Sequence, residues 1–138
     1  MSAPRATVLI VDDSATIRHI LRVYLSGLAG VEVREASDGS EGLAAVDAGG
    51  VDLVIADLRM PGVDGLEFLR RLRARPDSKH SQIPVILLTM ETAPGLREQL
   101  LDAGASEYLT KPISNAVLRA TVLALLPLQL GPASEEKP

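Results

Sequence analysis

Short apolar runs alternate along this chain with longer segments in which apolar residues recur every three or four positions. The runs have the length of buried strands, and the recurring segments have the period of amphipathic helices. This alternation is typical of βαβ units, so we expect an α/β fold with a doubly wound, five-stranded parallel sheet and helices on both faces. The second run alternates apolar and charged residues, which predicts a half-exposed edge strand. The expected strands are 7–11, 31–35, 51–56, 84–88 and 105–109.

A single domain accounts for most of the chain. The expected elements occupy residues 6–126, and residues 1–5 and 127–138 have the character of N-terminal and C-terminal tails. Pro127 is expected to end the last helix at about Leu126, because proline has no backbone N–H with which to continue it. Side chains of the kinds that cap helix N-termini precede four of the expected helices, at Ser14, Asp38, Asp64 and Ser114.

Polar residues close the expected strands. Asp12 and Asp13 follow the first, Asp57 follows the third, Thr89 closes the fourth, and Lys111 lies just after the fifth. The ends of the strands in an open parallel sheet converge on one rim, where ligands bind. Clustered carboxylates suit a divalent cation, and a neighbouring lysine suits an anion. The arrangement therefore predicts Mg²⁺-assisted transfer of a phosphoryl group to a carboxylate.

Composition narrows the function classes. The net charge of −4 offers no basic surface for nucleic acid or for a membrane. The chain has no cysteine, which excludes disulfides and thiolate zinc sites and suits a reducing compartment. It also contains no apolar run long enough to span a bilayer. We therefore expect a cytoplasmic domain that binds neither nucleic acid nor membranes.

Several motifs occur together and in order: VLIVDDS at 8–14, ADLRMPGVDG at 56–65, LT at 88–89 and TKP at 110–112. With these motifs the chain resembles the receiver domain of two-component response regulators, and among them the stand-alone, CheY-like chemotaxis type. The resemblance covers residues 6–126. It implies a flavodoxin-like (βα)5 fold and a switch that works by binding another protein.

The resemblance also assigns roles to the acids. Asp57 would accept the phosphoryl group from a phosphohistidine of a histidine kinase or phosphotransfer protein. Asp13, Asp57 and the backbone carbonyl of Arg59 would hold Mg²⁺, and Asp12 would contribute directly or through water. Mg²⁺ suits such a site because it prefers hard oxygen ligands and retains several waters.

The remaining roles concern the phosphoryl group and the switch. Lys111 and the Thr89 hydroxyl would bind phosphoryl oxygens, and a cis peptide bond before Pro112 would aim Lys111 into the site. Tyr108 resembles the switch aromatic that turns inward when Thr89 moves toward the phosphoryl group. The output would be a protein-binding face formed by the last two helices and the strand between them.

Three residues at the rim depart from the family. Met90 replaces the small residue that usually follows Thr89, and its long side chain is expected to narrow access to Asp57 or obstruct Tyr108. In the family, the positions of Arg59 and Glu91 flank the route of the water that hydrolyses the acyl phosphate. An Arg59–Glu91 pair would cover that route, so we expect slow self-dephosphorylation.

The last helix is unusually apolar. Between Ala116 and Leu126 only Arg119 and Thr121 are polar, which predicts a helix buried on more than one side. We therefore expect this helix to contact a partner protein or a second copy of the chain. Two residues of the following tail, Leu128 and Leu130, are candidates for the same contact.

Other charged residues have plain structural interpretations. The arginine run on the third helix is expected to be a solvated face, and neither histidine has the spacing of a metal ligand, so both are expected to be exposed. These residues are Arg70, Arg71, Arg73, Arg75, His19 and His80.

Alternative functions remain open. A phosphorelay intermediate or phosphate sink needs the same site without movement of Tyr108. The chain also fits the receiver of a longer transcriptional regulator, although Glu135 and Glu136 give no sign of a following domain. A phosphatase of the haloacid-dehalogenase type is disfavoured, because that family has an acid where this chain has Arg59. We expect no enzymatic activity beyond the chain's own phosphoryl transfer and slow dephosphorylation.

Overall fold

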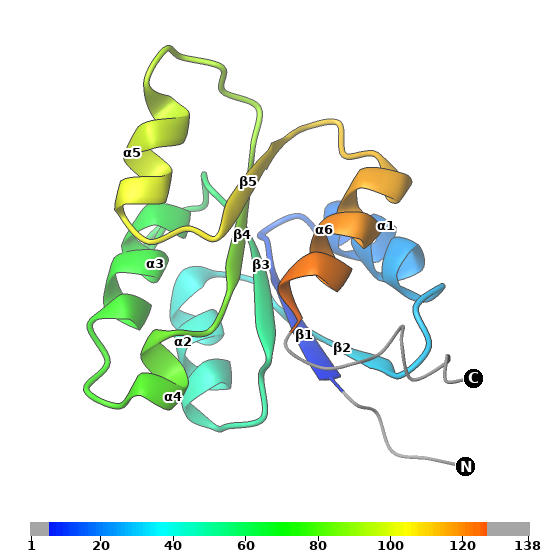
Figure 1. The fold of residues 1–138 in the computed structure, drawn as a ribbon, viewed down its shortest axis with the longest axis horizontal. Coiled ribbons are helices and arrows are strands. Elements are labelled where there is room, and N and C mark those ends of the chain that lie inside the picture. Colours follow the sequence, from blue (N-terminus) through cyan, green and yellow to red (C-terminus); the bar gives the residue numbers. More distant parts are fainter. Residues whose placement is uncertain (1–5, 127–138) are drawn as a thin grey trace.

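The computed structural model describes residues 6–126, and a parallel sheet forms its centre (Figure 1). The strands lie in the order β2-β1-β3-β4-β5, and every neighbouring pair is parallel. The chain therefore winds outward in both directions from β1, which confirms the expected doubly wound sheet. The strands are β1 (Ala6–Val11), β2 (Val31–Ala36), β3 (Leu53–Asp57), β4 (Val85–Thr89) and β5 (Glu107–Thr110).

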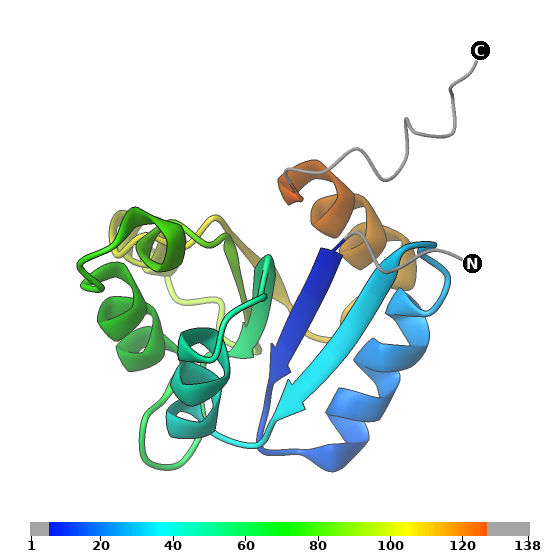
Figure 2. The same cartoon turned by 90° about the horizontal axis from the view of Figure 1, so that it is seen from below.

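Helices cover both faces of this sheet, as Figures 1 and 2 show. Helices α1 and α6 lie side by side on one face, and the other helices lie on the opposite face. Within the described residues, no helix has the length and apolar character needed to cross a membrane. The helices are α1 (Ala15–Leu25), α2 (Gly39–Asp47), α3 (Gly65–Arg73), α4 (Ser78–Ser81), α5 (Leu96–Asp102) and α6 (Asn115–Leu125).

Burial on both faces explains why the central strands are continuous apolar runs. In β1, Leu9 and Val11 join the cluster under α2, α3 and α5, whereas Val8 and Ile10 join the cluster under α1 and α6. Successive strand residues point to opposite faces, so a strand covered on both sides needs an apolar residue at every position. Strand β2 is less buried and lies at the edge of the sheet, as its alternating sequence predicts.

The four expected helix caps are present. In each case the side chain of the capping residue accepts a hydrogen bond from the backbone N–H three residues later, which satisfies a donor that the helix leaves unpaired. The distances are 3.2 Å for Ser14, 2.8 Å for Asp38, 2.9 Å for Asp64 and 3.2 Å for Ser114.

Three local features differ from what the sequence predicts. The sequence does not signal α4, because a helix of four residues is too short to show a period; its cap, Asp77, accepts a hydrogen bond from the N–H of His80 at 2.9 Å. His80 also pairs with the Asp77 carboxylate, and only 21% of its side chain is exposed, so the expectation that it is exposed is wrong. His19 is exposed as expected. The fifth strand starts at Glu107 rather than at residue 105.

Arg73 is not part of a solvated face, which corrects the interpretation of the arginine run. Its guanidinium is half-buried and donates to the backbone carbonyls of Gly104 at 2.8 Å, Ser81 at 2.9 Å and Ile83 at 2.8 Å. Burial lowers the pKa of Arg73 from its ordinary value. The side chain thus ties α3 to the segments that lead into β4 and β5. Arg70 and Arg71 are exposed, as expected. Arg75 is not: it follows the end of α3, is partly buried and pairs with Asp47 at 2.8 Å.

Replacing Arg73 by methionine should destabilise the fold. The change leaves three partly buried carbonyls without their donor, and we expect a loss of about 2–3 kcal/mol in the free energy of unfolding. Urea denaturation measures this loss. The control is Arg70→Met, which alters an exposed arginine of the same helix and should change stability by less than about 0.5 kcal/mol. Equal stability of the two variants would contradict the structural role of Arg73.

Candidate functional site

The polar residues that the sequence places at strand ends meet at one rim of the sheet. Asp12 and Asp13 follow β1, and Asp57 is the last residue of β3. One carboxylate oxygen from each of these acids lies within 4.8 Å of the others. Lys111, just after β5, approaches the same group and places its Nζ 3.2 Å from Asp57 Oδ1. The site therefore combines three acids with one lysine.

Asp12 is the most deeply buried of the three acids, with only 1% of the residue exposed. Its Oδ1 accepts a hydrogen bond from the backbone N–H of Ser14 at 2.8 Å. Its Oδ2 is buried without a hydrogen bond from any described residue, because Lys111 Nζ is 3.8 Å away. Burial raises the pKa of Asp12 above its ordinary value, although the Ser14 hydrogen bond opposes this. An unpartnered buried oxygen of this kind calls for a cation.

The acids together fit a Mg²⁺ ion. Asp57 is 8% exposed and Asp13 is exposed, so the group is open to solvent on one side. Mg²⁺ prefers a few carboxylate oxygens with several retained waters, and an open acidic group provides this combination. Asp12, Asp13 and Asp57 are the described residues that form such a group.

Lys111 is positioned by its backbone. The peptide bond between Lys111 and Pro112 is cis, as the resemblance to receiver domains implies. The backbone N–H of Lys111 donates to the carbonyl oxygen of Thr89 at 2.8 Å, which holds the start of this loop against the end of β4. The side chain is 18% exposed, so its ammonium group lies at the rim rather than in bulk solvent.

Thr89 lies beside the acids with its hydroxyl only partly engaged. The residue is 1% exposed, and its Oγ1 accepts a hydrogen bond from the backbone N–H of Glu91 at 2.9 Å. A threonine hydroxyl also carries one hydrogen that it can donate. Thr89 therefore retains a donor for an anion held at the rim.

Gly65 allows α3 to begin close to the end of β3. A Cβ atom at this position would clash with the backbone oxygen of Asp57 and lie 2.8 Å from the Cα of Leu58. The N–H of Gly65 donates to the carbonyl of Leu58 at 2.9 Å. Asp64 caps α3, as expected. A glycine after Asp64 is thus a steric requirement of the loop that follows Asp57.

The rim carries the Arg59–Glu91 pair that the sequence predicts. Both the Nε and an Nη atom of Arg59 donate to the Glu91 carboxylate, the latter at 2.9 Å. These hydrogen bonds lower the pKa of Glu91 from its ordinary value. The two residues also line a pocket of about 260 Å³ between the loop after Asp57 and the start of α5. Met90, between Thr89 and Glu91, points outward and is 78% exposed.

Tyr108 lies on β5, the strand that leads to Lys111. It is partly buried at the edge of the cluster under α5, and the Arg97 guanidinium lies 5.9 Å from the centre of its ring. Arg97 also pairs with Glu107 at 3.1 Å. The aromatic ring therefore has a defined partner on α5, which the sequence does not indicate because Arg97 and Tyr108 are eleven positions apart.

Sequence reasoning also missed Arg18. Its guanidinium reaches the loop that carries Asp12 and Asp13 and donates to the backbone carbonyl of Asp12 at 2.6 Å. The available signal was its position in the sequence, since an arginine at the end of the first turn of the helix after an acid pair can fold back over that loop. An arginine on a surface helix is common, so this signal alone does not single it out.

Known proteins resemble this chain along most of its length. The family described as the response regulator receiver domain matches residues 8–123. The cyclic di-GMP phosphodiesterase response regulator RpfG of Xanthomonas campestris pv. campestris is 42% identical over 88% of this chain, which spans 32% of RpfG. Chemotaxis protein CheY-3 of Vibrio cholerae is 36% identical over 81% of this chain and 85% of its own length. The solved structure of Vibrio cholerae chemotaxis protein CheY4 matches with a TM-score of 0.79 at 36% identity, covering 88% of this chain and 98% of that one.

Proposed function

This chain belongs to the response regulator receiver domain family, and we propose that it is a signalling switch turned on by phosphorylation of Asp57. The observation that carries the proposal is the contact between Lys111 and Asp57 inside a group of three carboxylates. Receiver domains are signalling modules that take a phosphoryl group from a histidine kinase. They have no enzymatic activity other than this chemistry on their own aspartate.

The proposed reaction is a direct displacement at phosphorus. A carboxylate oxygen of Asp57 attacks the phosphorus of a phosphohistidine, and the phosphorus–oxygen bond forms as the phosphorus–nitrogen bond breaks. The imidazole leaves with the electron pair of that bond and is protonated from solvent. Lys111 is within 3.2 Å of Asp57, so its ammonium can pair with an oxygen of the transferred group. The product is an acyl phosphate.

We propose that Asp12, Asp13, Asp57 and the backbone carbonyl of Arg59 hold Mg²⁺ for this step. The support is the acid group and the buried Asp12 oxygen that no described residue bonds. The ion would offset the charge of the carboxylates and of the incoming phosphoryl group. The role of Lys111 is complementary, since it supplies a positive charge from the protein.

The proposed switch uses Thr89 and Tyr108. The Thr89 hydroxyl has a free hydrogen and would donate it to a phosphoryl oxygen, which draws the residue toward Asp57. Tyr108 would then turn inward and leave its position beside Arg97. Both movements alter the face formed by α5, β5 and α6, where we propose that a protein target binds.

The rim residues are proposed to set the lifetime of the phosphorylated state. Arg59 and Glu91 form a hydrogen-bonded pair, which in the proposal would cover the approach to the acids. The Glu91 backbone N–H donates to the Thr89 hydroxyl. A shift of Thr89 toward a phosphoryl group therefore pulls directly on Glu91. Met90 is exposed at the same rim, and its influence on access to Asp57 stays a prediction.

Helix α6 is proposed to form part of the partner surface. Within one chain it is buried on one side only, through Leu118 and Val122. Five apolar residues form an exposed stripe on its other side, which we call the α6 stripe. Such a stripe is suited to a partner or to a second copy. The expected contribution of Leu128 and Leu130 lies outside the described residues. The α6 stripe consists of Ala116, Val117, Ala120, Leu123 and Ala124.

A second candidate is the receiver of a longer regulator. The observation that favours it is the match to RpfG, of which this chain spans 32%. A phosphorelay intermediate or sink would use the same site. The cytoplasmic location and the lack of nucleic-acid and membrane partners expected from the sequence stay predictions.

The central prediction is Mg²⁺-dependent phosphorylation of Asp57. Incubation with a small phosphodonor and Mg²⁺ should add one phosphoryl group by mass spectrometry, and the adduct should be absent from Asp57→Asn. Asp102→Asn is the matched control, because it removes an exposed acid from α5 and should be modified like the wild type. Modification without Mg²⁺, or at another residue, would overturn the proposal.

The Tyr108 ring resonances distinguish a switch from a relay or sink. If they stay unchanged when Asp57 is phosphorylated, or when beryllofluoride is bound there, a relay or sink is favoured.

Removing the Arg59 side chain should shorten the lifetime of phospho-Asp57. In Arg59→Ala the route of the hydrolytic water is uncovered, and we expect dephosphorylation to accelerate by about 3- to 10-fold, which corresponds to roughly 1 kcal/mol of activation free energy. Loss of the adduct with time measures the rate. Arg71→Ala is the control, since Arg71 also forms an exposed pair with a glutamate, Glu67, but on α3. A rate equal to that of the wild type would refute the role of the pair.

The α6 stripe should support association in solution. We expect the wild type with Mg²⁺ and beryllofluoride to show a higher mass by light scattering, and Val117→Glu to return it to the monomer. Val117 is 49% exposed; the control residue Val23, on α1, is 52% exposed, and Val23→Glu should not change the mass. A monomeric wild type at high concentration, with and without beryllofluoride, would exclude the self-association and leave only a different protein as the partner.

A further inference from the structure

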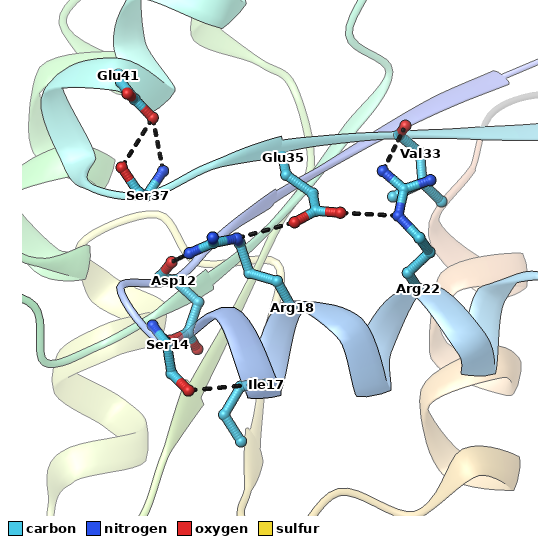
Figure 3. A network of polar contacts seen from close by, with 9 residues as sticks. All are labelled: Asp12, Ser14, Ile17, Arg18, Arg22, Val33, Glu35, Ser37 and Glu41. Carbon is cyan, nitrogen blue, oxygen red and sulfur yellow. Dashed lines mark hydrogen bonds and ion pairs between the residues drawn. The ribbon is translucent and has the colours of Figure 1, made fainter.

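A network of charged side chains joins α1 to the edge strand β2 (Figure 3). The two oxygens of Glu35, on β2, are shared between two arginines of α1. Oε1 accepts a hydrogen bond from Arg18 Nε at 2.8 Å, and Oε2 accepts one from Arg22 Nε at 2.7 Å. The two arginines lie one helical turn apart, so they face the same carboxylate.

Only one of the two arginines also reaches the metal loop. Arg18 donates through an Nη atom to the backbone carbonyl of Asp12 at 2.6 Å, whereas the further contact of Arg22 is with the carbonyl of Val33 at 3.4 Å. Figure 3 shows the Arg18 side chain extended between Asp12 and Glu35. Arg18 is the more buried of the two, with 17% of its side chain exposed against 47% for Arg22.

The carbonyl that Arg18 binds belongs to the peptide between Asp12 and Asp13. A peptide unit is planar, so a hydrogen bond to its carbonyl fixes the orientation of the whole unit, including the bond that leads to the Cα of Asp13. The other side of Asp12 is held as well, because its backbone N–H donates to the carbonyl of Ala36 at 3.1 Å. Both hydrogen bonds therefore connect this loop to β2, one through Arg18 and Glu35 and the other directly to Ala36.

Asp13 depends on this anchoring more than Asp12 does. The Asp12 carboxylate is held by the N–H of Ser14. The Asp13 carboxylate is exposed, and no residue within 6–126 donates a hydrogen bond to it. Its location relative to Asp12 and Asp57 thus depends on the backbone that carries it, which is anchored by Arg18 on one side of Asp12 and by Ala36 on the other.

Glu35 keeps the arginine in place and offsets its charge. A positive guanidinium behind an acidic group would otherwise oppose the binding of a cation there. Hydrogen bonds from Arg22 and Arg18 hold the pKa of Glu35 below its ordinary value, so the carboxylate stays charged to lower pH than a free glutamate does. The Glu35 carboxylate, which is shared with Arg22, offsets part of the positive charge of the Arg18 side chain that bonds the Asp12 carbonyl.

We propose that Arg18 is a positioning residue of the metal site: it fixes the Asp12–Asp13 peptide against β2 and thereby aims the Asp13 carboxylate at the ion. This inference rests on the proposed function, because it concerns the same Mg²⁺ site. It adds a residue that does not touch the metal, the phosphoryl group or Asp57. Residues of this kind, which orient the ligands of a metal, alter its affinity when they are removed.

Two variants separate positioning from general stabilisation. Arg18→Met removes the donor to Asp12 and one pair with Glu35. Arg22→Met removes the other pair with Glu35 and leaves the Asp12 carbonyl untouched. In the metal-free protein, the ¹³C resonance of the Asp12 carbonyl should move upfield in Arg18→Met and stay in place in Arg22→Met, because only the first loses a hydrogen bond to that oxygen.

Mg²⁺ titration by calorimetry or NMR then tests the consequence. We expect the dissociation constant to rise by about 10-fold in Arg18→Met, with less than a twofold change in Arg22→Met. Equal affinities in the wild type and Arg18→Met, or equal losses in the two folded variants, would overturn the inference while leaving the proposed function intact. A wild type that binds no Mg²⁺ would overturn the proposed function, and the inference with it.

Discussion

The mutual repulsion of three carboxylates is the main constraint on the site. One oxygen from each of them lies within 4.8 Å of the others at the rim of the sheet. Two like charges about 4 Å apart repel by roughly 4 kcal/mol at the effective dielectric near a protein surface. Lys111 offsets part of this repulsion through its contact with Asp57. The remaining negative charge and the unpartnered oxygen of Asp12 make a cation the natural complement of the site.

The scaffold holds these charges together because it leaves their backbone little freedom. The two strands that lead to the acids, β1 and β3, are buried on both faces, and the loop after β1 is tied to β2 through Ala36, Arg18 and Glu35. The rim is organised differently. There, Thr89, Glu91 and Arg59 are linked in series by hydrogen bonds and are more exposed toward the outer end. The buried strands and the anchored loop after β1 suit the binding of an ion, and the more exposed rim suits a response to an anion.

Much of this arrangement could be predicted from local sequence. The apolar runs predict the strands, and the side chains of Ser14 and Asp38 predict where helices begin, because both signals involve residues close together in the chain. The acids, Thr89 and Lys111 could be assigned to one site because parallel strands end on the same rim. By contrast, the roles of Arg73 and Arg18 could not be predicted. Arg73 bonds to a carbonyl 31 residues away, and Arg18 is paired with an acid 17 residues away.

The sequence alone therefore determined the strands and the longer helices, their alternation and the chemical character of the site, since each of these depends on residue type and short-range spacing. The tertiary structure decided which charged side chains are structural. It turned one arginine of a run into a half-buried connection between segments and placed another behind the Asp12–Asp13 peptide. It also placed the apolar residues of α6 on a buried and an exposed side. Long arginines reach carbonyls from many starting points, so their partners depend on how distant segments pack.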